Sequence, residues 1–479
     1  MSRLKILLLL GSVIFAGCVL PPKEAPRPRQ LASDSVGLTG AAAQPAADGW
    51  WDSFQDPQLD RLIRLSANDN PTLAQVNARV GEALAQAQSA HAGLLPSANL
   101  DASALYQRAP DNYLIPPPLA GHSFWMGQAG ASLGWDLDFG GRQADALRRA
   151  QKLTQSAQLD VDNARLMLAG AVTQAYVELY REYLLADIAE RSEAQRQDIV
   201  NITRRRVAAG LDTQLELRQA EGQLPQARVA RAQARAAADL AVHQLATLAG
   251  QGAEGYASIQ RPRLRLQAAL PVPAALPINL LARRPDVLSA RLAVEAADQG
   301  RLAAKAAFYP DVSLRALAGI GAFGMSNLVQ WSARGYGAGP LVSLPLFDGG
   351  RLRAEYRGSE AQLDGAIASY NDTVLHAVQQ TADQITRLDA LAREEIDQQQ
   401  TLESNEAAYK LAEERYKAGL ASYLTVLNAE TQVLAARQGM VDIQTGQVLA
   451  RVTLLLAVGG SFDPQRTENT SGILTRTVQ

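Results

Sequence analysis

Cysteine and histidine are scarce in this chain of 479 residues, which contains one cysteine, Cys18, and four histidines. A single cysteine excludes an intrachain disulfide and leaves little for metal chemistry. The histidines are isolated, with no second ligand at metal-binding spacing. A phosphate-binding loop of the Gly-x-x-x-x-Gly-Lys type is also absent. The sequence therefore predicts a protein that is not an enzyme and holds no metal or dissociable cofactor.

Charge of one sign, aromatic residues and long apolar runs are scarce as well. The formal net charge is −2, so the chain lacks the basic footprint of a protein that binds nucleic acid. Aromatic residues make up 5% of the chain, which predicts a thin core of the kind found between closely packed helices. No apolar run reaches the roughly 20 residues that a membrane-spanning helix requires.

What the chain does contain is an internal repeat. Gly140-Gly141-Arg142 returns 209 residues later as Gly349-Gly350-Arg351, and at the same offset the run from Arg206 to Leu211 returns as the run from Arg415 to Leu420. A duplicated unit of this size is typical of an architectural protein rather than of a single catalytic cleft. We place the first repeat at residues 50–260 and the second at residues 261–460.

Proline placement indicates what each repeat is made of. The chain contains 22 prolines, yet none lies in residues 119–224 or 346–463, which are rich in strong helix formers. The segment between the two glycine marks of a repeat would form a helix of about 100 Å, at roughly 1.5 Å per residue. In the second repeat, apolar residues step by threes, fours and sevens from residue 352 to residue 388, which predicts a coiled-coil seam.

Each long helix is predicted to end in a tight hairpin. Gly210 and Gly419 stand where the chain needs a left-handed residue to reverse. Thr213 and Ser422 follow three residues later as candidate N-caps of a returning helix. The two repeats therefore each contain a long helical hairpin, with tips near residues 210 and 419.

The hydrophobic period changes to two in residues 97–139 and 311–347, which predicts a β-hairpin in each repeat. The strands are about ten residues long, the length that a transmembrane β-strand requires. Two amphipathic hairpins that cover a soluble core are the alternative. Four strands cannot close a barrel, since small closed barrels have about eight. Two chains would give eight strands around a filled lumen, and three would give twelve around a pore.

The N-terminus carries an export signal. Arg3 and Lys5 precede an apolar run, residues 6–15, which leads into Ala16-Gly17-Cys18. This order is typical of a lipoprotein signal peptide, residues 1–17, with Cys18 as the lipidated residue of the mature chain. The alternative is a cysteine that is discarded with the signal. Residues 18–49 are proline-rich at their start and are predicted to be a flexible, lipid-anchored tether. Residues 461–479 are predicted to be a disordered tail.

Six motifs, in a fixed order along the chain, carry a resemblance to a known family. They are Trp50-Trp51-Asp52-Ser53-Phe54, Asp56-Pro57-Gln58-Leu59, Arg283-Arg284-Pro285-Asp286-Val287, Ala307-Phe308-Tyr309-Pro310, the run from Pro345 to Arg351 and the run from Arg415 to Leu427. Each is weak alone, but together they span nearly the whole mature chain. The sequence resembles the TolC-like outer-membrane efflux factor family, and within it the lipoprotein (NodT-like) branch that serves resistance-nodulation-division pumps.

The resemblance implies a mainly α-helical chain with a β-barrel part, assembled as a homotrimer. Three chains would share a twelve-stranded barrel in the outer membrane of a Gram-negative bacterium, four strands from each, on a long periplasmic α-helical barrel. The implied function is passive conduction of small toxic molecules from a periplasmic adaptor and an inner-membrane pump to the exterior. A duct for protein secretion is one alternative. A periplasmic coiled-coil lipoprotein without a pore is another, against which the alternating hairpins argue.

The resemblance also assigns roles to the hairpin tips. Adaptor contact falls on tip residues of both repeats, namely Arg206, Gly210, Thr213, Arg415, Gly419 and Ser422. These glycines and N-caps are also explained by the needs of the turn alone.

A periplasmic gate falls on Tyr416, Thr425 and Asn428. Members of the family commonly have acidic residues at the latter two positions, which are neutral here, and Ala421 replaces a basic partner. We therefore expect closure by packing and neutral hydrogen bonds. A plain packing role is the alternative for Tyr416.

Overall fold

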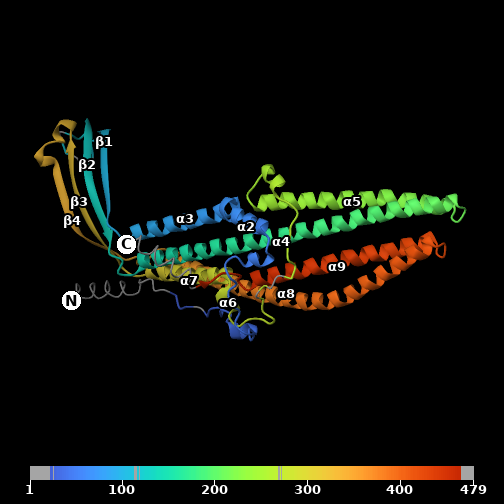
Figure 1. Ribbon diagram of the computed structural model, residues 1–479. Coiled ribbons are helices and arrows are strands. Elements are labelled where there is room, and N and C mark those ends of the chain that lie inside the picture. The colour runs from blue at the N-terminus through green and yellow to red at the C-terminus, as the bar shows by residue number, and fades with distance from the viewer. Residues whose placement is uncertain are drawn as a thin grey trace.

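The computed structural model describes residues 22–464, apart from residues 25, 113–115, 118, 268–269 and 271. The described chain is elongated, with a β-sheet at one end and two long helical hairpins that extend to the other (Figure 1). Cys18, the signal segment and most of the 461–479 tail lie outside the described residues, so the lipidation and tail predictions stay predictions.

One antiparallel sheet contains all four named strands of the described chain, β1 (Ser97–Arg108), β2 (Ser123–Asp136), β3 (Asp311–Phe323) and β4 (Arg334–Ser343), in the order β1-β2-β3-β4. The repeats join at the centre, where Ala131 of β2 pairs with Ala318 of β3. Large apolar side chains stand out from the sheet, as Leu100 at 79% exposure and Tyr336 at 90% illustrate. The hairpins lie within the predicted ranges, although the second ends at Ser343 rather than near residue 347.

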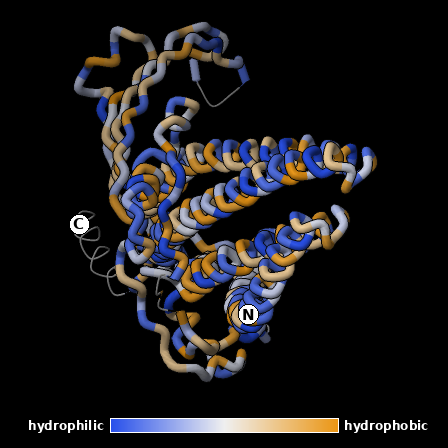
Figure 2. Tube along the Cα trace, turned by 45° about the vertical axis from the view of Figure 1, so that its right-hand side comes forward, coloured by the Kyte–Doolittle hydropathy of each residue, from blue (hydrophilic) through white to orange (hydrophobic). Residues whose placement is uncertain are grey.

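Two helices of 67 residues each form the shafts of the molecule, α4 (Arg142–Ala208) and α8 (Arg351–Lys417). At about 1.5 Å per residue, each spans about 100 Å. The predicted seam on α8 is buried over most of its length, including Leu352, Tyr356 and Val374. Each shaft returns as a helix of 35 residues, α5 (Gln214–Leu248) or α9 (Tyr423–Ala457). Figure 2 shows the two hairpins as separate arms on which hydrophobic and hydrophilic residues alternate along the helices.

The connection from sheet to shaft explains the repeated glycine mark. Gly141 and Gly350 precede the shafts with φ of 76° and 92°, a left-handed conformation that glycine adopts at little cost. Asp138 accepts hydrogen bonds from the free backbone amides at the start of α4, and Asp348 does the same for α8. The same turn therefore joins strand to helix in both repeats.

Shorter helices pack around the sheet-proximal half of the shafts. α2 (Pro57–Asp69) and α3 (Pro71–Ala92) lead to β1, and α7 (Pro285–Ala306) leads to β3. Both α3 and α7 lie against α4, and α7 also contacts α8. Two hydrophobic clusters lie here, one under η2 (Trp50–Phe54) and α2, the other between α6 (Leu280–Arg283), α7 and α8. A third cluster lies close to the hairpin tips.

The predicted flexible tether is wrong for its described part, residues 22–24 and 26–48, which form an ordered segment that we call the N-terminal strap. Glu24 accepts hydrogen bonds from Arg301 and Lys305 of α7, both at 3.1 Å. The Asn371 side chain binds the backbone at residues 29 and 31. Leu38 is 2% exposed within the α6–α8 cluster. Proline density suggested a free segment, but side chains from distant helices hold the strap in place.

The strap ends against the C-terminal turn, residues 458–463. The backbone amide of Ala46 donates to the carbonyl oxygen of Gly460 at 3.1 Å. From the other side, the Arg283 guanidinium donates to the same carbonyl at 3.0 Å. The end of the strap, α6 and the C-terminal turn therefore meet in one place.

Candidate functional site: the hairpin tips

The two hairpin tips lie side by side at the end of the molecule farthest from the sheet (Figure 1). Gly210 and Gly419 form the turns with φ of 72° and 81°. Thr213 caps α5, because its hydroxyl accepts from the Leu215 amide at 3.1 Å. Ser422 occupies the matching position before α9 but makes no such bond, and its hydroxyl lies 3.2 Å from that of Thr425. The two turns are alike in backbone and differ in capping.

A buried network joins the two tips. Tyr416, at 0% exposure, comes from α8 and reaches the first hairpin. Its hydroxyl donates to Asp212 Oδ2 at 2.7 Å and lies 2.8 Å from the hydroxyl of Thr203. The gate role of Tyr416 stays a prediction, and neither partner of its hydroxyl was predicted from the sequence. We call Thr203, Arg206, Asp212 and Tyr416 the tip lock.

Arg206, which the resemblance assigns to adaptor contact at the surface, is buried instead. It is 9% exposed, and its guanidinium forms a bidentate ion pair with Asp212 at 2.8 and 3.0 Å. Nη1 donates to the backbone carbonyl of Tyr416 at 2.7 Å, and the guanidinium carbon lies 4.6 Å from the centroid of its ring. Because Arg206 is buried and donates three hydrogen bonds within the chain, it is a structural member of the tip lock rather than a surface contact. The other five predicted contact residues are exposed.

Hydrogen bonds and the ion pair within the tip lock stabilise the charged forms of Asp212 and Arg206. The hydrogen bonds from Arg206, then the bond from Tyr416, hold the pKa of Asp212 below its usual range, despite burial. The same ion pair raises the pKa of Arg206. Burial, above all, raises the pKa of the Tyr416 hydroxyl to about 12, so it is a neutral donor near pH 7. Hydrogen bonds between charged partners are roughly twice as strong as neutral ones. This contact within the chain thus includes an ion pair, while closure of the gate by packing and neutral hydrogen bonds stays a prediction.

The other two predicted gate residues, Thr425 and Asn428, are exposed on α9. Both are neutral, so within one chain no acidic pair stands at these positions. The carboxylate that matters lies elsewhere, in the first repeat.

A second buried ion pair joins the hairpins nearer the middle of the molecule. Glu430 of α9 is 4% exposed and accepts from Arg196 Nε at 3.1 Å and from the Ser192 hydroxyl at 3.3 Å, both on α4. This helix carboxylate is buried between the hairpins instead of facing solvent. A signal was available, because Glu430 lies on the same helical face as Val426 and Val433, both buried.

The family motifs outside the tips hold the fold together. Asp56 caps α2 and accepts from the Tyr176 hydroxyl at 2.7 Å, and Gln58 donates to that hydroxyl at 2.8 Å. Arg284 forms a bidentate pair with Asp286 and donates to the carbonyl oxygen of Ala457 at 3.0 Å. These residues fix α2 and α7 on the shafts rather than line a reactive site.

No arrangement suited to catalysis is found among the described residues. Gly130-Ala131-Ser132-Leu133-Gly134 spells a Gly-x-Ser-x-Gly sequence, but Ser132 lies inside β2 instead of on the strand-to-helix turn that a nucleophile requires. In the described ranges, no three residues of the His, Cys, Asp or Glu type gather closely enough to hold a metal ion. None of the described helices is both long and apolar enough to cross a membrane.

Known proteins resemble this chain in both sequence and structure. The outer membrane efflux protein family model matches residues 62–251 and 276–460, one match in each repeat. Fusaric acid resistance protein FusA of Burkholderia cepacia is 37% identical over 75% of this chain and 70% of its own length. Multidrug resistance outer membrane protein MdtP of Escherichia coli is 29% identical over 96% and 97%. Among solved structures, the outer membrane protein VceC of Vibrio cholerae has a TM-score of 0.82 and 31% identity, covering 88% of this chain and 100% of that one.

Proposed function

The chain belongs to the outer membrane efflux protein family, and from this membership we propose that it is the outer-membrane duct of a tripartite efflux pump. The resemblance inferred from the six motifs is confirmed by the family match. Relatives that are named for multidrug resistance and for fusaric acid resistance favour small toxic molecules as the cargo. The duct conducts passively, and the energy comes from a pump in the inner membrane.

The observation that carries this proposal is the sheet with two free edges. β1 and β4 are outer strands, and their apolar side chains are exposed on a sheet of only four strands. Unpaired strand edges are not tolerated in lipid, so the sheet must close with other copies. Three copies give a twelve-stranded barrel with room for a pore, in agreement with the trimers of the family.

The hairpin tips are the proposed docking face for a periplasmic adaptor. The exposed residues of the first tip are Gly210 and Thr213. Those of the second tip are Arg415, Gly419 and Ser422. Replacing Gly419 with Val tests this role. The valine would strain a backbone with φ of 81° by about 1–3 kcal/mol, while the long packed helices keep the trimer intact. We expect normal trimer levels in the outer membrane, weaker adaptor cross-linking and lower drug resistance.

The matched control is Gly222→Ala, on α5, where an added Cβ meets no atom within 4 Å and the backbone is helical. This change should leave all three measurements unaffected. Normal cross-linking and full resistance in Gly419→Val would show that the second tip is only a turn.

The pump is proposed to be of the resistance-nodulation-division type, as in the branch that the motifs resemble. Cys18 is proposed to carry the lipid that anchors the N-terminus in the outer membrane. The duct itself is tested by conductance of the purified protein in planar bilayers. Discrete channels from a trimer are expected, and a folded monomer without conductance would contradict the proposal.

A further inference from the structure

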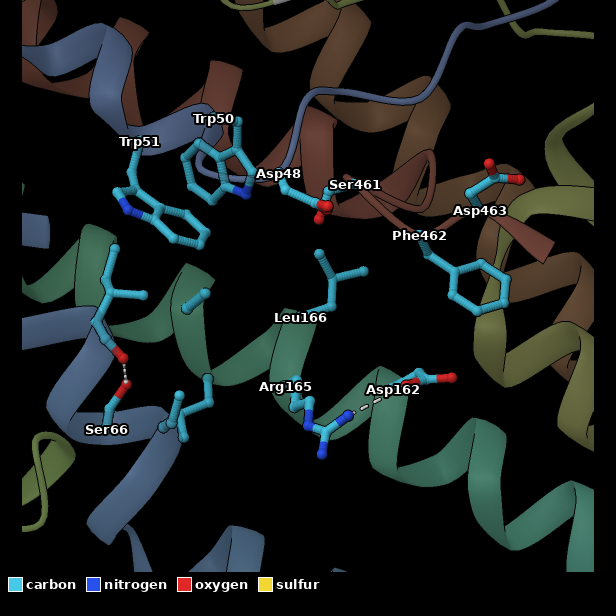
Figure 3. Close-up of a pocket in the computed structure, with 14 residues that line it drawn as sticks. Asp48, Trp50, Trp51, Ser66, Asp162, Arg165, Leu166, Ser461, Phe462 and Asp463 are labelled. Atoms are coloured by element: carbon cyan, nitrogen blue, oxygen red, sulfur yellow. Dashed lines mark hydrogen bonds and ion pairs between the residues drawn. The ribbon is translucent and has the colours of Figure 1, made fainter. Parts of the chain in front are cut away.

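A cavity of about 450 Å³ lies beside the shaft, outside the tip region, and the proposed duct gives it no role. Its walls come from the end of the N-terminal strap, α2, α4 and the C-terminal turn. Figure 3 shows Trp50 and Trp51 on one side, Leu166 in the middle and Phe462 on the other side. The two indole rings stand 5.6 Å apart at 74° to each other, so the cavity has two aromatic walls of different orientation.

One buried polar group in this wall has no partner. Trp50 is 5% exposed, and its indole N–H finds no hydrogen-bond acceptor in the described chain. Figure 3 places that nitrogen on the edge of the ring that faces Asp48 across the cavity mouth. A buried donor without an acceptor costs about 1–3 kcal/mol. A ligand with an acceptor at this point would remove that cost.

The polar rim of the cavity is mainly acidic. Three carboxylates and one guanidinium line it, those of Asp48, Asp162, Asp463 and Arg165, and Asp48 and Asp463 already have interaction partners. Asp463 also acts electrostatically on the buried Arg283. Asp162 has only a long ion pair with Arg165, at 3.6 Å, and burial raises its pKa despite that arginine. A second cation near Asp162 would therefore be stabilised.

A second cavity is lined by residues of α4, α5, α8 and α9, with Ala171 among them. Asp162 precedes Ala171 by nine positions, which at 100° per residue is half a turn beyond two full turns. The Asp162 position therefore lies on the face of α4 opposite to Ala171.

We propose that this cavity is a binding site for an amphipathic organic cation, with a quaternary or protonated amine, an apolar body and a hydrogen-bond acceptor. The cation lies at the carboxylate of Asp162, which Figure 3 shows on the Phe462 side of Leu166. The apolar body lies against Leu166 and Phe462, and the acceptor receives the Trp50 N–H. The ligand is held at the side of the duct and is not transported through this site.

Benzoylcholine is a suitable probe, because it combines a quaternary ammonium group, an ester acceptor and an aromatic ring. Its neutral carbon isostere, 3,3-dimethylbutyl benzoate, keeps the shape and removes the charge. Binding to the full-length protein in lipid nanodiscs is measured by calorimetric titration. We expect saturable binding of benzoylcholine and at least tenfold weaker binding of the isostere. No saturable binding, or equal binding of both compounds, would overturn the proposal.

Variants with opposite expected signs make the test specific. Asp162→Asn should weaken benzoylcholine binding at least tenfold, whereas Arg165→Gln, which removes the competing cation, should strengthen it. Trp50→Phe keeps an aromatic wall and removes the N–H, and should weaken binding severalfold. Asp372→Asn, on the exposed surface of α8, is the control. Benzoylcholine affinity that is unchanged in both Asp162→Asn and Arg165→Gln would refute the site. Poor folding cannot explain the expected pattern, because it would not strengthen binding in Arg165→Gln.

Discussion

At the scale of single residues, the tip lock shows what sequence reasoning found and what it missed. Tyr416 was predicted at the gate from its motif, but Asp212 and Thr203 lie 204 and 213 residues earlier. Hydrophobic periodicity carries no information about such pairs. The repeat did contain a sign of the role of Asp212, because the corresponding residue of the second repeat is the uncharged Ala421. A charge in only one of two equivalent turns indicates a specific partner.

Removing the Tyr416 hydroxyl should loosen the tips. Tyr416→Phe deletes the bonds to Asp212 and Thr203 and keeps the ring under Arg206. If these hydrogen bonds stabilise the closed tips by about 1–2 kcal/mol, their loss would raise the fraction of channels with open tips roughly fivefold to thirtyfold. Single-channel conductance measures this. Tyr409→Phe is the control, since Tyr409 is a buried α8 tyrosine whose hydroxyl makes no hydrogen bond within the described chain. Equal effects of the two changes would remove Tyr416 from the lock.

The pH dependence of the lock follows from Asp212. Its pKa is depressed in the folded chain, so its contribution is fully present above the unfolded pKa of about 3.9 and disappears as the pH falls through the lower folded value. Conductance should stay low from about pH 8 to pH 5 and rise only below about pH 4. Asp212→Asn should abolish this acid-dependent step. A transition near pH 6 would show that another group controls the tips.

At the scale of elements, local patterns predicted most of the architecture. The glycine marks, the proline-free stretches and the period of two gave the shafts, the tips and the four strands, because these features arise from neighbours along the chain. Ser422 shows a limit of prediction from residue type. It stands at the N-cap position of α9, but its side chain makes no capping hydrogen bond. Glycines inside the sheet show another limit. Their importance depends on how closely the neighbouring strand approaches.

Two glycines of β3 provide a matched test of strand packing. A Cβ at Gly319 would lie 2.6 Å from the carbonyl oxygen of Ala129 and 2.8 Å from the Cα of Gly130, both backbone atoms of β2. Gly321 lies two residues further on the same face, and a Cβ there would meet its nearest atom at 3.9 Å. Gly319→Ala should therefore reduce heat-resistant trimer on a semi-native gel, and Gly321→Ala should not. Equal trimer levels would mean that β2 can shift at no cost.

At the scale of the whole molecule, the repeat predicted two similar halves, and the family model matches the chain twice, over residues 62–251 and 276–460. The N-terminal strap could not be predicted, because its order depends on Asn371 and on α7, hundreds of residues away. Composition alone made residues 18–49 look like a free tether. The contact of Glu24 with Lys305 instead places the start of the strap at the sheet-proximal end of α7.

This placement gives the lipid anchor a definite geometry. Cys18 precedes Glu24 by six residues, at most about 20 Å of extended chain, so a lipid on Cys18 would lie close to the base of the sheet. Cys18→Ser should remove the acyl mass from the N-terminus, as measured by intact-mass spectrometry. Trimers should still form, because strand pairing does not involve this residue. A wild-type protein without acyl mass would exclude the lipoprotein assignment.

The meeting of strap and C-terminal turn has a consequence for biogenesis. Ala46 and Trp50 belong to the same cluster as Val452 and Leu455, from the last described helix. A chain exported N-terminus first can form the hairpin of α4 and α5 from local contacts while the rest is still being translocated. Its main core, however, must wait for Val452 and Leu455 of α9 to arrive. A nascent chain therefore exposes apolar surface to the periplasm until α9 has been exported, and a truncation near residue 450 should be degraded rather than inserted.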